Sequence, residues 1–260
     1  MTDVNRPPVV SRREWLAVID TLRVREKAHT REGDAIAAAR RRLPMTEVDP
    51  SAPLVGGEGH VPLIDVFEGR TQLFVSYHMW HDGHTAADQC EGCTFFTGQV
   101  RELSYLHQRD VTFAVFCQGP YEESDRYRRF MGWDMPWYSV PAESHERLVA
   151  GRHFGMKACY LRDGDRVYET YWTTGRGVEP MAPSYGILDM TVYGRQETWE
   201  NSPSGWPQPY ETLGQQFRRD GRPTAQWARI AAGHDDDLHN AQPSTSTGTS
   251  SSDCCRTRQA

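Results

Sequence analysis

The chain has 260 residues, of which 35 are Asp or Glu and 29 are Lys or Arg, so its formal net charge at pH 7 is −6. This length can bury a substantial core as one large domain or two small ones, and the acidic balance excludes the basic surface expected of a nucleic-acid-binding protein. No stretch approaches the roughly 20 apolar residues of a membrane span, and residues 1–6 lack the apolar segment of a secretory signal. We therefore expect a cytoplasmic protein that binds neither nucleic acid nor membrane.

The first predicted element is a long helix. Residues 11–14 read Ser-Arg-Arg-Glu, the pattern of a capping box, and apolar residues follow at helical spacing. The pattern continues to about Arg42, with Gly33 as a candidate break, and Pro44 ends it. We expect residues 1–45 to form an N-terminal helical extension that packs on the body or on a partner chain, with a homodimer as one option. Its apolar residues are Trp15, Val18, Ile19 and Leu22.

The central part of the chain alternates between predicted strands and helices. Residues 45–61 are rich in Pro and Gly and predict a loop, and residues 62–70 predict a short turn of helix. The apolar runs that follow are continuous, which indicates parallel strands covered on both faces. The sequence Asp-Gly-Asp at 163–165 predicts a hairpin turn. The predicted strands are 72–80, 111–117, 137–140, 157–162 and 166–174, and the predicted helices are 90–108, 121–131 and 143–150.

Two C-terminal segments differ from the body in composition. Residues 175–210 are rich in Gly, Pro, Tyr and Trp, and we expect an ordered loop-and-strand extension packed on the body. Residues 233–260 form a Ser/Thr-rich tail that contains Cys254 and Cys255. Such a composition cannot bury enough surface to order itself, so we expect the tail to be disordered.

The candidate site is the sequence Cys90-Glu91-Gly92-Cys93, which lies between a predicted strand and a predicted helix. The free N–H groups and partial positive charge at a helix N-terminus favour a thiolate. Six cysteines in 260 residues are too few for a disulfide scaffold, so this pair indicates redox or metal chemistry. We expect Cys90 to be the exposed nucleophile and Cys93 to resolve the mixed disulfide. Glu91 should raise the pKa of the neighbouring thiol.

A second reading of the same segment is a metal site. Three histidines, His78, His81 and His84, recur every third residue just before the cysteine pair. Imidazole and thiolate together are ligands that suit copper or zinc. Cys90 and Cys93 with one or two of these histidines could therefore hold a single metal ion. The third option is that both cysteines are buried residues without chemistry.

Several separated motifs resemble a known family. The lead-in at 62–70 and the order strand, Cys-x-x-Cys, helix resemble the thioredoxin-like fold in its peroxiredoxin-style branch. Over about residues 9–210 the chain resembles, more narrowly, the DUF899 family of bacterial proteins. The motifs that carry this resemblance are VSRREWL at 10–16, YHM at 77–79, the cysteine pair, RFMGW at 129–133, PW at 136–137, YGILDMT at 185–191 and GR at 194–195.

The resemblance implies an α/β fold with a central mixed sheet flanked by helices. The thioredoxin-like domain would occupy residues 46–232, between the N-terminal extension and the 233–260 tail. The chain departs from thioredoxins next to the cysteines, where thioredoxins carry Trp before the pair and Gly-Pro within it, and this chain has Gln89, Glu91 and Gly92. The sequence Phe-Gly-Met at 154–156 also lacks the cis-proline that faces the cysteines in thioredoxins.

Two functions follow from these residues. The leading one is a thiol–disulfide oxidoreductase that needs no bound cofactor, draws electrons from a cellular thiol donor and acts on a protein or small-molecule thiol or disulfide. The alternative is a copper (or zinc) carrier or metal-dependent oxidase. Copper-delivery proteins of the Sco type share the fold and use a histidine far downstream, for which His153 is a candidate here. A binding module without either activity is the remaining reading.

Overall fold

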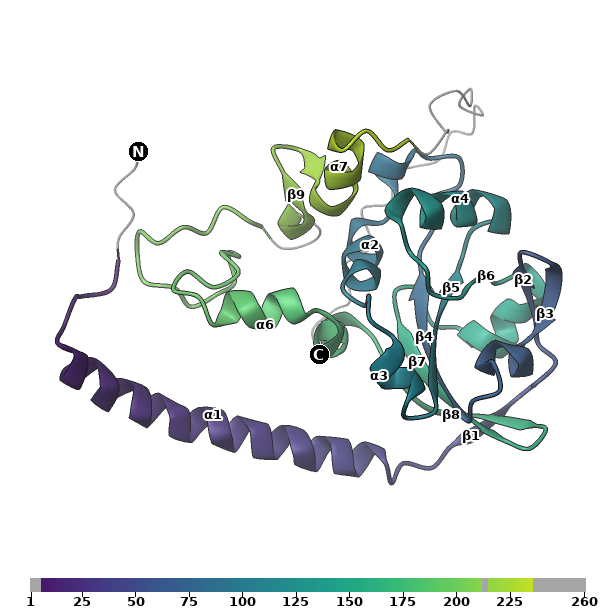
Figure 1. Ribbon diagram of the computed structural model, residues 1–260, viewed down its shortest axis with the longest axis horizontal. Coiled ribbons are helices and arrows are strands. Elements are labelled where there is room, and N and C mark those ends of the chain that lie inside the picture. The colour runs from purple at the N-terminus through teal and green to yellow at the C-terminus, as the bar shows by residue number, and fades with distance from the viewer. Residues whose placement is uncertain (1–5, 212–214, 236–260) are drawn as a thin grey trace.

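A central mixed β-sheet organises the molecule (Figure 1). The computed structural model describes residues 6–211 and 215–235. Eight strands pair in the order β1-β8-β7-β4-β5-β6-β2-β3. Their bounds are β1 Thr46–Val48, β2 Pro53–Gly56, β3 Gly59–Pro62, β4 Gln72–His78, β5 Val111–Cys117, β6 Trp137–Ser139, β7 Lys157–Asp163 and β8 Arg166–Thr173.

The strand directions confirm the thioredoxin-like fold. β4 and β5 pair in parallel, as do β5 and β6, so each connection between them crosses over the sheet with a helix. β7 pairs antiparallel with β4, and β8 returns as a hairpin partner of β7. The order β5-β4-β7-β8, with helices after β4 and β5, is the core arrangement that the resemblance implied, and it places the end of β4 in the middle of one sheet edge.

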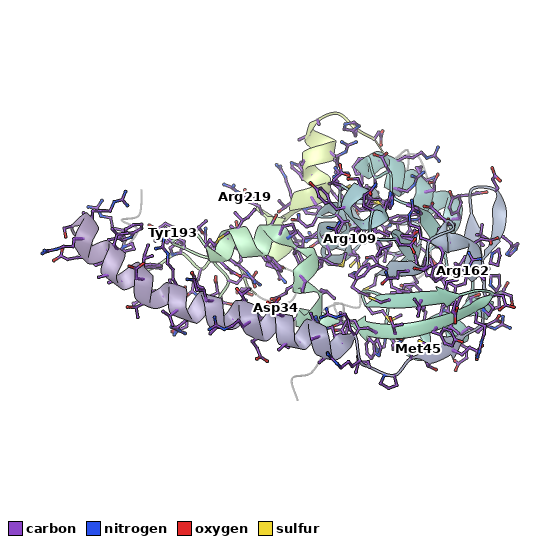
Figure 2. All side chains as sticks on the ribbon, turned by 60° about the horizontal axis from the view of Figure 1, so that its bottom comes forward. Asp34, Met45, Arg109, Arg162, Tyr193 and Arg219 are labelled. Carbon is purple, nitrogen blue, oxygen red and sulfur yellow. The ribbon has the colours of Figure 1, made fainter. Side chains whose placement is uncertain are left out.

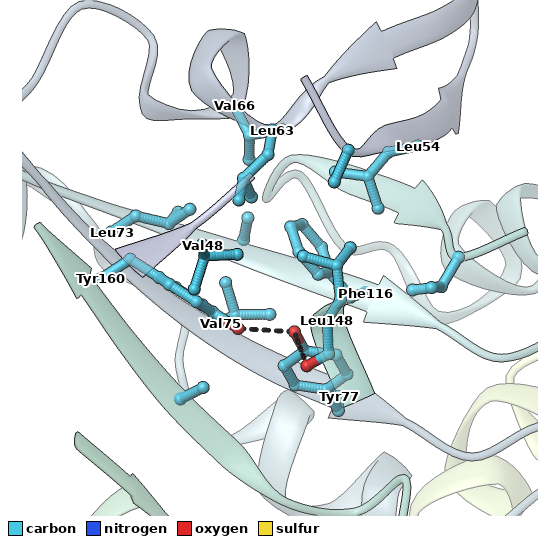
Figure 3. Close-up of a cluster of buried hydrophobic side chains, with 14 of the residues drawn as sticks. Val48, Leu54, Leu63, Val66, Leu73, Val75, Tyr77, Phe116, Leu148 and Tyr160 are labelled. Carbon is cyan, nitrogen blue, oxygen red and sulfur yellow. Dashed lines mark hydrogen bonds between the residues drawn. The ribbon is translucent and has the colours of Figure 1, made fainter. Parts of the chain in front are cut away.

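β4 is buried on both faces because its alternate side chains enter two different cores. Leu73, Val75 and Tyr77 point into the first core, which is covered by η1 (Leu63–Phe67), α5 (Ala142–Ser144) and the π-helix η3 (His145–Val149). Figure 3 shows the first core, where the hydroxyl groups of Tyr77 and Tyr160 lie 2.7 Å apart. Phe74 points to the second core, formed with α4 (Tyr121–Met131) and with Val100, Leu103 and Leu106, which follow the cysteine-bearing helix.

The helix predicted at 90–108 is two helices in the structure, α2 (Glu91–Gly98) and α3 (Ser104–His107). Side chains of the residues between the two helices make tertiary contacts. The Gln99 side-chain oxygen accepts hydrogen bonds from the backbone N–H and hydroxyl group of Ser184, and Arg101 donates to the Gly132 carbonyl oxygen. The other predicted helices and strands of the body are confirmed within a few residues.

The prediction of a loop at 45–61 is wrong, because this segment forms β1, β2 and β3. Its prolines and glycines lie at strand ends, where Pro53 pairs with Pro62 and Gly56 with Gly59 in an edge hairpin. Proline is tolerated as the first residue of a strand, as Pro53 is in β2, and in an edge strand such as β3, where no further strand needs the missing N–H of Pro62. A Pro- and Gly-rich composition therefore describes this hairpin as well as it describes a loop.

The extension at 175–210 is more helical than predicted. It contains η4 (Gly175–Met181) and α6 (Pro183–Asp189), and its one β feature is an isolated bridge between Glu197 and Tyr210. Four further elements, which the sequence patterns did not predict, follow it: η5 (Gln215–Phe217), β9 (Arg218–Arg219), β10 (Arg222–Pro223) and α7 (Thr224–Ala231). Most of the 233–260 tail, with Cys254 and Cys255, lies outside the described residues, and the domain limits at 45, 46 and 232 stay predictions.

The predicted N-terminal helix is α1 (Arg12–Arg40), which begins at the Ser11 capping box and runs past Gly33 without a break. None of its 29 residues is buried. Figure 1 shows α1 leaving the body beside β1 and β8 and running out below α6, and Figure 2 shows the same helix with its side chains. Within the described ranges, no helix combines the length and apolar character needed to span a membrane.

Candidate active site

The cysteine pair lies where the fold places it, between the end of β4 and the start of α2. Cys90 is the residue before the first turn of α2, and Cys93 lies within that turn. The two thiol groups are in hydrogen-bond contact, and the Cys93 sulfur also accepts from the Met79 backbone N–H at 3.4 Å. Both cysteines are free thiols. A reduced dithiol in direct contact is therefore present at this edge of the sheet.

Gln89 shapes the loop that carries the pair. Its buried side-chain oxygen accepts from the His81 N–H at 3.0 Å, and its nitrogen donates to the carbonyl oxygens of His81 and His84 at 2.8 and 3.0 Å. These three hydrogen bonds close the 81–89 loop around one amide group. The position where thioredoxins carry Trp thus has a structural role in this chain.

The prediction of an exposed Cys90 is wrong. Cys90 is 5% exposed and Cys93 is 6% exposed. Three residues from beyond the extension, which we call the C-terminal cover, lie over the cysteine loop: Phe217, Arg218 and Gln226. The Phe217 ring lies 3.3 Å from where a Cβ atom on Gly92 would be, and Gln226 donates to the Gln89 carbonyl oxygen at 3.2 Å.

The third residue of the C-terminal cover changes the expected role of Glu91. Arg218 forms an ion pair with the Glu91 carboxylate, so the negative charge beside the cysteines has a partner. The pKa of the Cys93 thiol is raised well above its usual value, first by the hydrogen bond with Cys90 and then by burial. The cause is therefore the paired thiol and the lack of water rather than Glu91.

Lys157 lies beside the cysteine pair, although the sequence patterns did not identify it as a candidate site residue. It is the first residue of β7, opposite Ser76 of β4, and it is only 2% exposed. Its Nζ donates to the Ser76 hydroxyl oxygen at 3.0 Å and to the Gly155 carbonyl oxygen at 3.3 Å. The Phe96 ring of α2 lies 6.0 Å from Nζ, so the amine lies between the sheet and the cysteine-bearing helix.

The charge of Lys157 interacts with the cysteine pair. Burial lowers the pKa of Lys157, while the charges of Cys93 and Cys90 act in the opposite direction. In return, Lys157 lowers the pKa of Cys93 against the effects that raise it. Among the described residues, no carboxylate forms a salt bridge with this ammonium group. The acidic groups that Lys157 faces are therefore thiols.

The three histidines of the metal reading do not gather with the cysteines. His78 is fully buried among the rings of Tyr127, Trp133 and Trp137, where burial lowers its pKa to about 3 and its Nδ1 contacts the Met79 carbonyl oxygen at 2.7 Å. His81 and His84 lie in the loop with ring centroids 5.6 Å apart. His153 is exposed before β7.

The predicted copper or zinc ligands therefore do not fit a single ion as they are arranged. In the part of the chain that the structure describes, no group of three or more His, Cys, Asp or Glu residues could hold a metal ion. The buried Nε2 of His78 has no hydrogen-bond partner in the described chain, and the imidazole ring lies 5.3 Å from the Trp137 ring, centroid to centroid. The metal reading thus gains no geometric support.

The other two described cysteines are structural by their surroundings. Cys117 ends β5 in the second core, and burial raises the pKa of its thiol to about 12. Cys159 in β7 is half-buried, and burial raises its pKa to about 11. Both thiols should therefore react slowly.

Comparison with known proteins gives a family and two distant structures. A family model described as bacterial protein of unknown function (DUF899) matches residues 4–219. No curated protein matches the chain. A chain described as a thiol:disulfide interchange protein, DsbE, from Chlorobium tepidum is 13% identical with a TM-score of 0.37, and the match covers 55% of this chain and 97% of that one. A point mutant of peroxiredoxin 6 from Arenicola marina is 13% identical with a TM-score of 0.35, covering 56% and 74%.

Proposed function

The chain belongs to the DUF899 family, and we propose that it is a thiol–disulfide oxidoreductase whose reacting groups are Cys90 and Cys93. The observation that carries this proposal is the contact between the two thiol groups at the start of α2, next to a buried lysine. A dithiol in contact can close to a disulfide with a small movement, because an S–S bond is about 2.05 Å long.

Reduction of a disulfide substrate by the Cys90–Cys93 dithiol balances in atoms and electrons. The Cys90 thiolate attacks one substrate sulfur, the substrate S–S bond breaks, and the first substrate thiol leaves with a proton. Cys93 then loses its proton, and its sulfur attacks Cys90 in the mixed disulfide, which releases the second substrate thiol. The substrate gains two electrons and two protons, and a cellular dithiol returns the Cys90–Cys93 disulfide to the reduced form.

Lys157 supplies what a buried resolving cysteine needs. The hydrogen bond with Cys90 and burial both raise the pKa of Cys93, so this thiol is a poor nucleophile without help. An amine whose own pKa is lowered by burial can accept the Cys93 proton. The ammonium that forms then stabilises the attacking thiolate. We assign Lys157 this role in the second step.

The C-terminal cover determines access to the pair. A substrate sulfur must approach Cys90 in line with the bond that breaks, and both cysteines are buried beneath a loop on which Phe217 lies against Gly92 and Arg218 pairs with Glu91. A movement of the cover, with separation of the Arg218–Glu91 ion pair, precedes the attack. The proposed enzyme therefore reacts through a transiently open state rather than through a permanently exposed thiol.

Thiol titration and mass spectrometry with glutathione disulfide as the probe test this proposal. Peptide mapping restricts the count to Cys90 and Cys93, and in wild-type protein these two thiols should be lost to an internal Cys90–Cys93 disulfide. Cys93→Ser should accumulate a mixed disulfide with one glutathionyl group on Cys90, because the resolving step is absent. Cys90→Ser should accumulate none.

Cys159→Ser is the matched control, since it removes a half-buried thiol of β7 and should leave the reaction unchanged. Glutathionylation of Cys90→Ser at the wild-type rate, or failure of the wild-type protein to form the internal disulfide, would refute the assignment.

A further inference from the structure

Helix α1 carries an apolar stripe that the chain itself leaves uncovered. Trp15, Val18 and Leu22 are 43%, 70% and 48% exposed, and they lie on one face of the helix with Ile19 at i, i+3, i+4 and i+7. An exposed stripe of this kind on a soluble domain is typical of an interaction surface. The family match begins at residue 4, so α1 is part of the shared domain.

The stripe lies far from the body. α1 is unbroken over 29 residues, which makes it about 43 Å long. Its C-terminal end is held at the sheet, where the Arg40 guanidinium stacks over the Tyr171 ring at 5.0 Å. Val18 therefore lies about 30 Å along the helix from that anchor. A straight helix held at one end cannot fold its far end back onto the core of its own chain.

A second uncovered apolar surface lies on the 175–210 extension. Ile187, Met190 and Val192 are 59%, 82% and 50% exposed, and Leu188 and Trp199 are 37% and 44% exposed. Their supporting backbone is fixed, because Arg195 forms ion pairs with Asp189 at 2.7 Å and with Glu179 at 3.2 Å. The extension is therefore a formed surface that lacks a partner within the described chain.

We infer that the protein is a twofold dimer with exchanged helices. In this dimer the α1 stripe of each copy packs on the apolar surface of the 175–210 extension of the other copy. The charges of the two segments are complementary. Residues 12–42 carry nine Arg or Lys and five Asp or Glu, whereas residues 175–211 carry two Arg or Lys and five Asp or Glu. Nine apolar side chains, each already partly covered, would meet in each contact, so two identical contacts would bury on the order of 1,500 Å², the size of a stable interface. A twofold axis makes both contacts identical and leaves neither surface free.

Sedimentation analysis of the full chain over a range of concentrations tests this inference. The wild-type protein should sediment as a dimer of the 29.7 kDa chain. Val18→Glu should weaken association by about 100-fold or more, because a carboxylate would enter an apolar interface. Val24→Glu is the matched control, since Val24 is 66% exposed on the opposite face of the same helix, and this variant should remain a dimer.

The second surface is tested separately with Met190→Asp, which should weaken association as much as Val18→Glu does. Circular dichroism should show that the variants retain their folded body. A monomeric wild-type protein at tens of micromolar would overturn the inference, and so would a dimer that Val18→Glu disrupts but Met190→Asp does not, because α1 would then pair with another α1. Neither result depends on the thiol chemistry.

Discussion

Replacing Lys157 with Met tests whether the amine group of this side chain, rather than its volume, assists the cysteine pair. Lys157→Met keeps the volume of the side chain and removes the buried amine that accepts the Cys93 proton and, once protonated, interacts with the thiolate. A charge–charge interaction in such an environment is worth about 1.4 to 3 kcal/mol. We therefore expect the rate of internal disulfide formation at pH 7 to fall about 10- to 100-fold, since 1.4 kcal/mol corresponds to a factor of about ten.

The direction of the pH effect follows from the sign of the interaction. Lys157 lowers the pKa of Cys93, so its loss raises that pKa and moves the rate profile to higher pH. Lys157→Arg keeps the positive charge but cannot accept a proton near neutral pH, because a guanidinium group stays protonated. Arg should therefore preserve glutathionylation of Cys90 while the resolving step stays slow.

Stopped-flow measurement of both steps between pH 6 and 10 provides the assay. The first step is followed by formation of the mixed disulfide and the second by release of glutathione. If Lys157→Met shows wild-type rates and an unchanged profile, Lys157 only fills space and the proposed role in the second step is refuted. Equal resolving rates for the Arg and Lys proteins would show that charge alone acts.

Three further outcomes are expected. Phe217→Ala should speed alkylation of Cys90 about tenfold or more, because it removes the ring over the cysteine loop. An unchanged alkylation rate, measured by mass spectrometry, would show that the C-terminal cover does not limit access to Cys90. The pKa of buried His78 is about 3, and that of an unfolded histidine is about 6.5. The stability present above pH 6.5 should therefore fall by about 5 kcal/mol as the pH drops toward 3, and His78→Phe should flatten this dependence in urea titrations. Tyr77→Phe should lower the free energy of unfolding by about 1 to 3 kcal/mol, because it leaves the buried Tyr160 hydroxyl and Leu148 carbonyl without this partner; a stability equal to that of wild type would show that water replaces it.

The parts of the site that follow from local sequence were predictable. β4, the cysteine pair and the start of α2 lie within some 30 consecutive residues, and apolar runs and spacing define them. Lys157 could not be found in this way, because it meets the thiols only through its pairing with Ser76, 81 residues earlier. One signal was present, since a lysine opens a strand whose neighbours are apolar.

The errors have the same origin. Phe217 and Arg218 follow the cysteines by more than 120 residues, so the pattern that predicted an exposed Cys90 contained no information on what covers it. The histidines recur at regular spacing, but β4 buries His78 while the loop carries His81 and His84 away. The edge hairpin was misread because Pro and Gly are common both in loops and at strand ends.

The C-terminal cover also bears on how this protein survives oxidative damage. Hydrogen peroxide converts an accessible thiolate first to sulfenic acid and then, irreversibly, to sulfinic acid. With both sulfurs less than a tenth exposed, peroxide reaches them only during brief openings, and the adjacent Cys93 can trap a sulfenic acid on Cys90 as a disulfide before a second oxidant arrives. Burial of the pair, which would slow the proposed thiol exchange, would thus also protect the dithiol from irreversible oxidation.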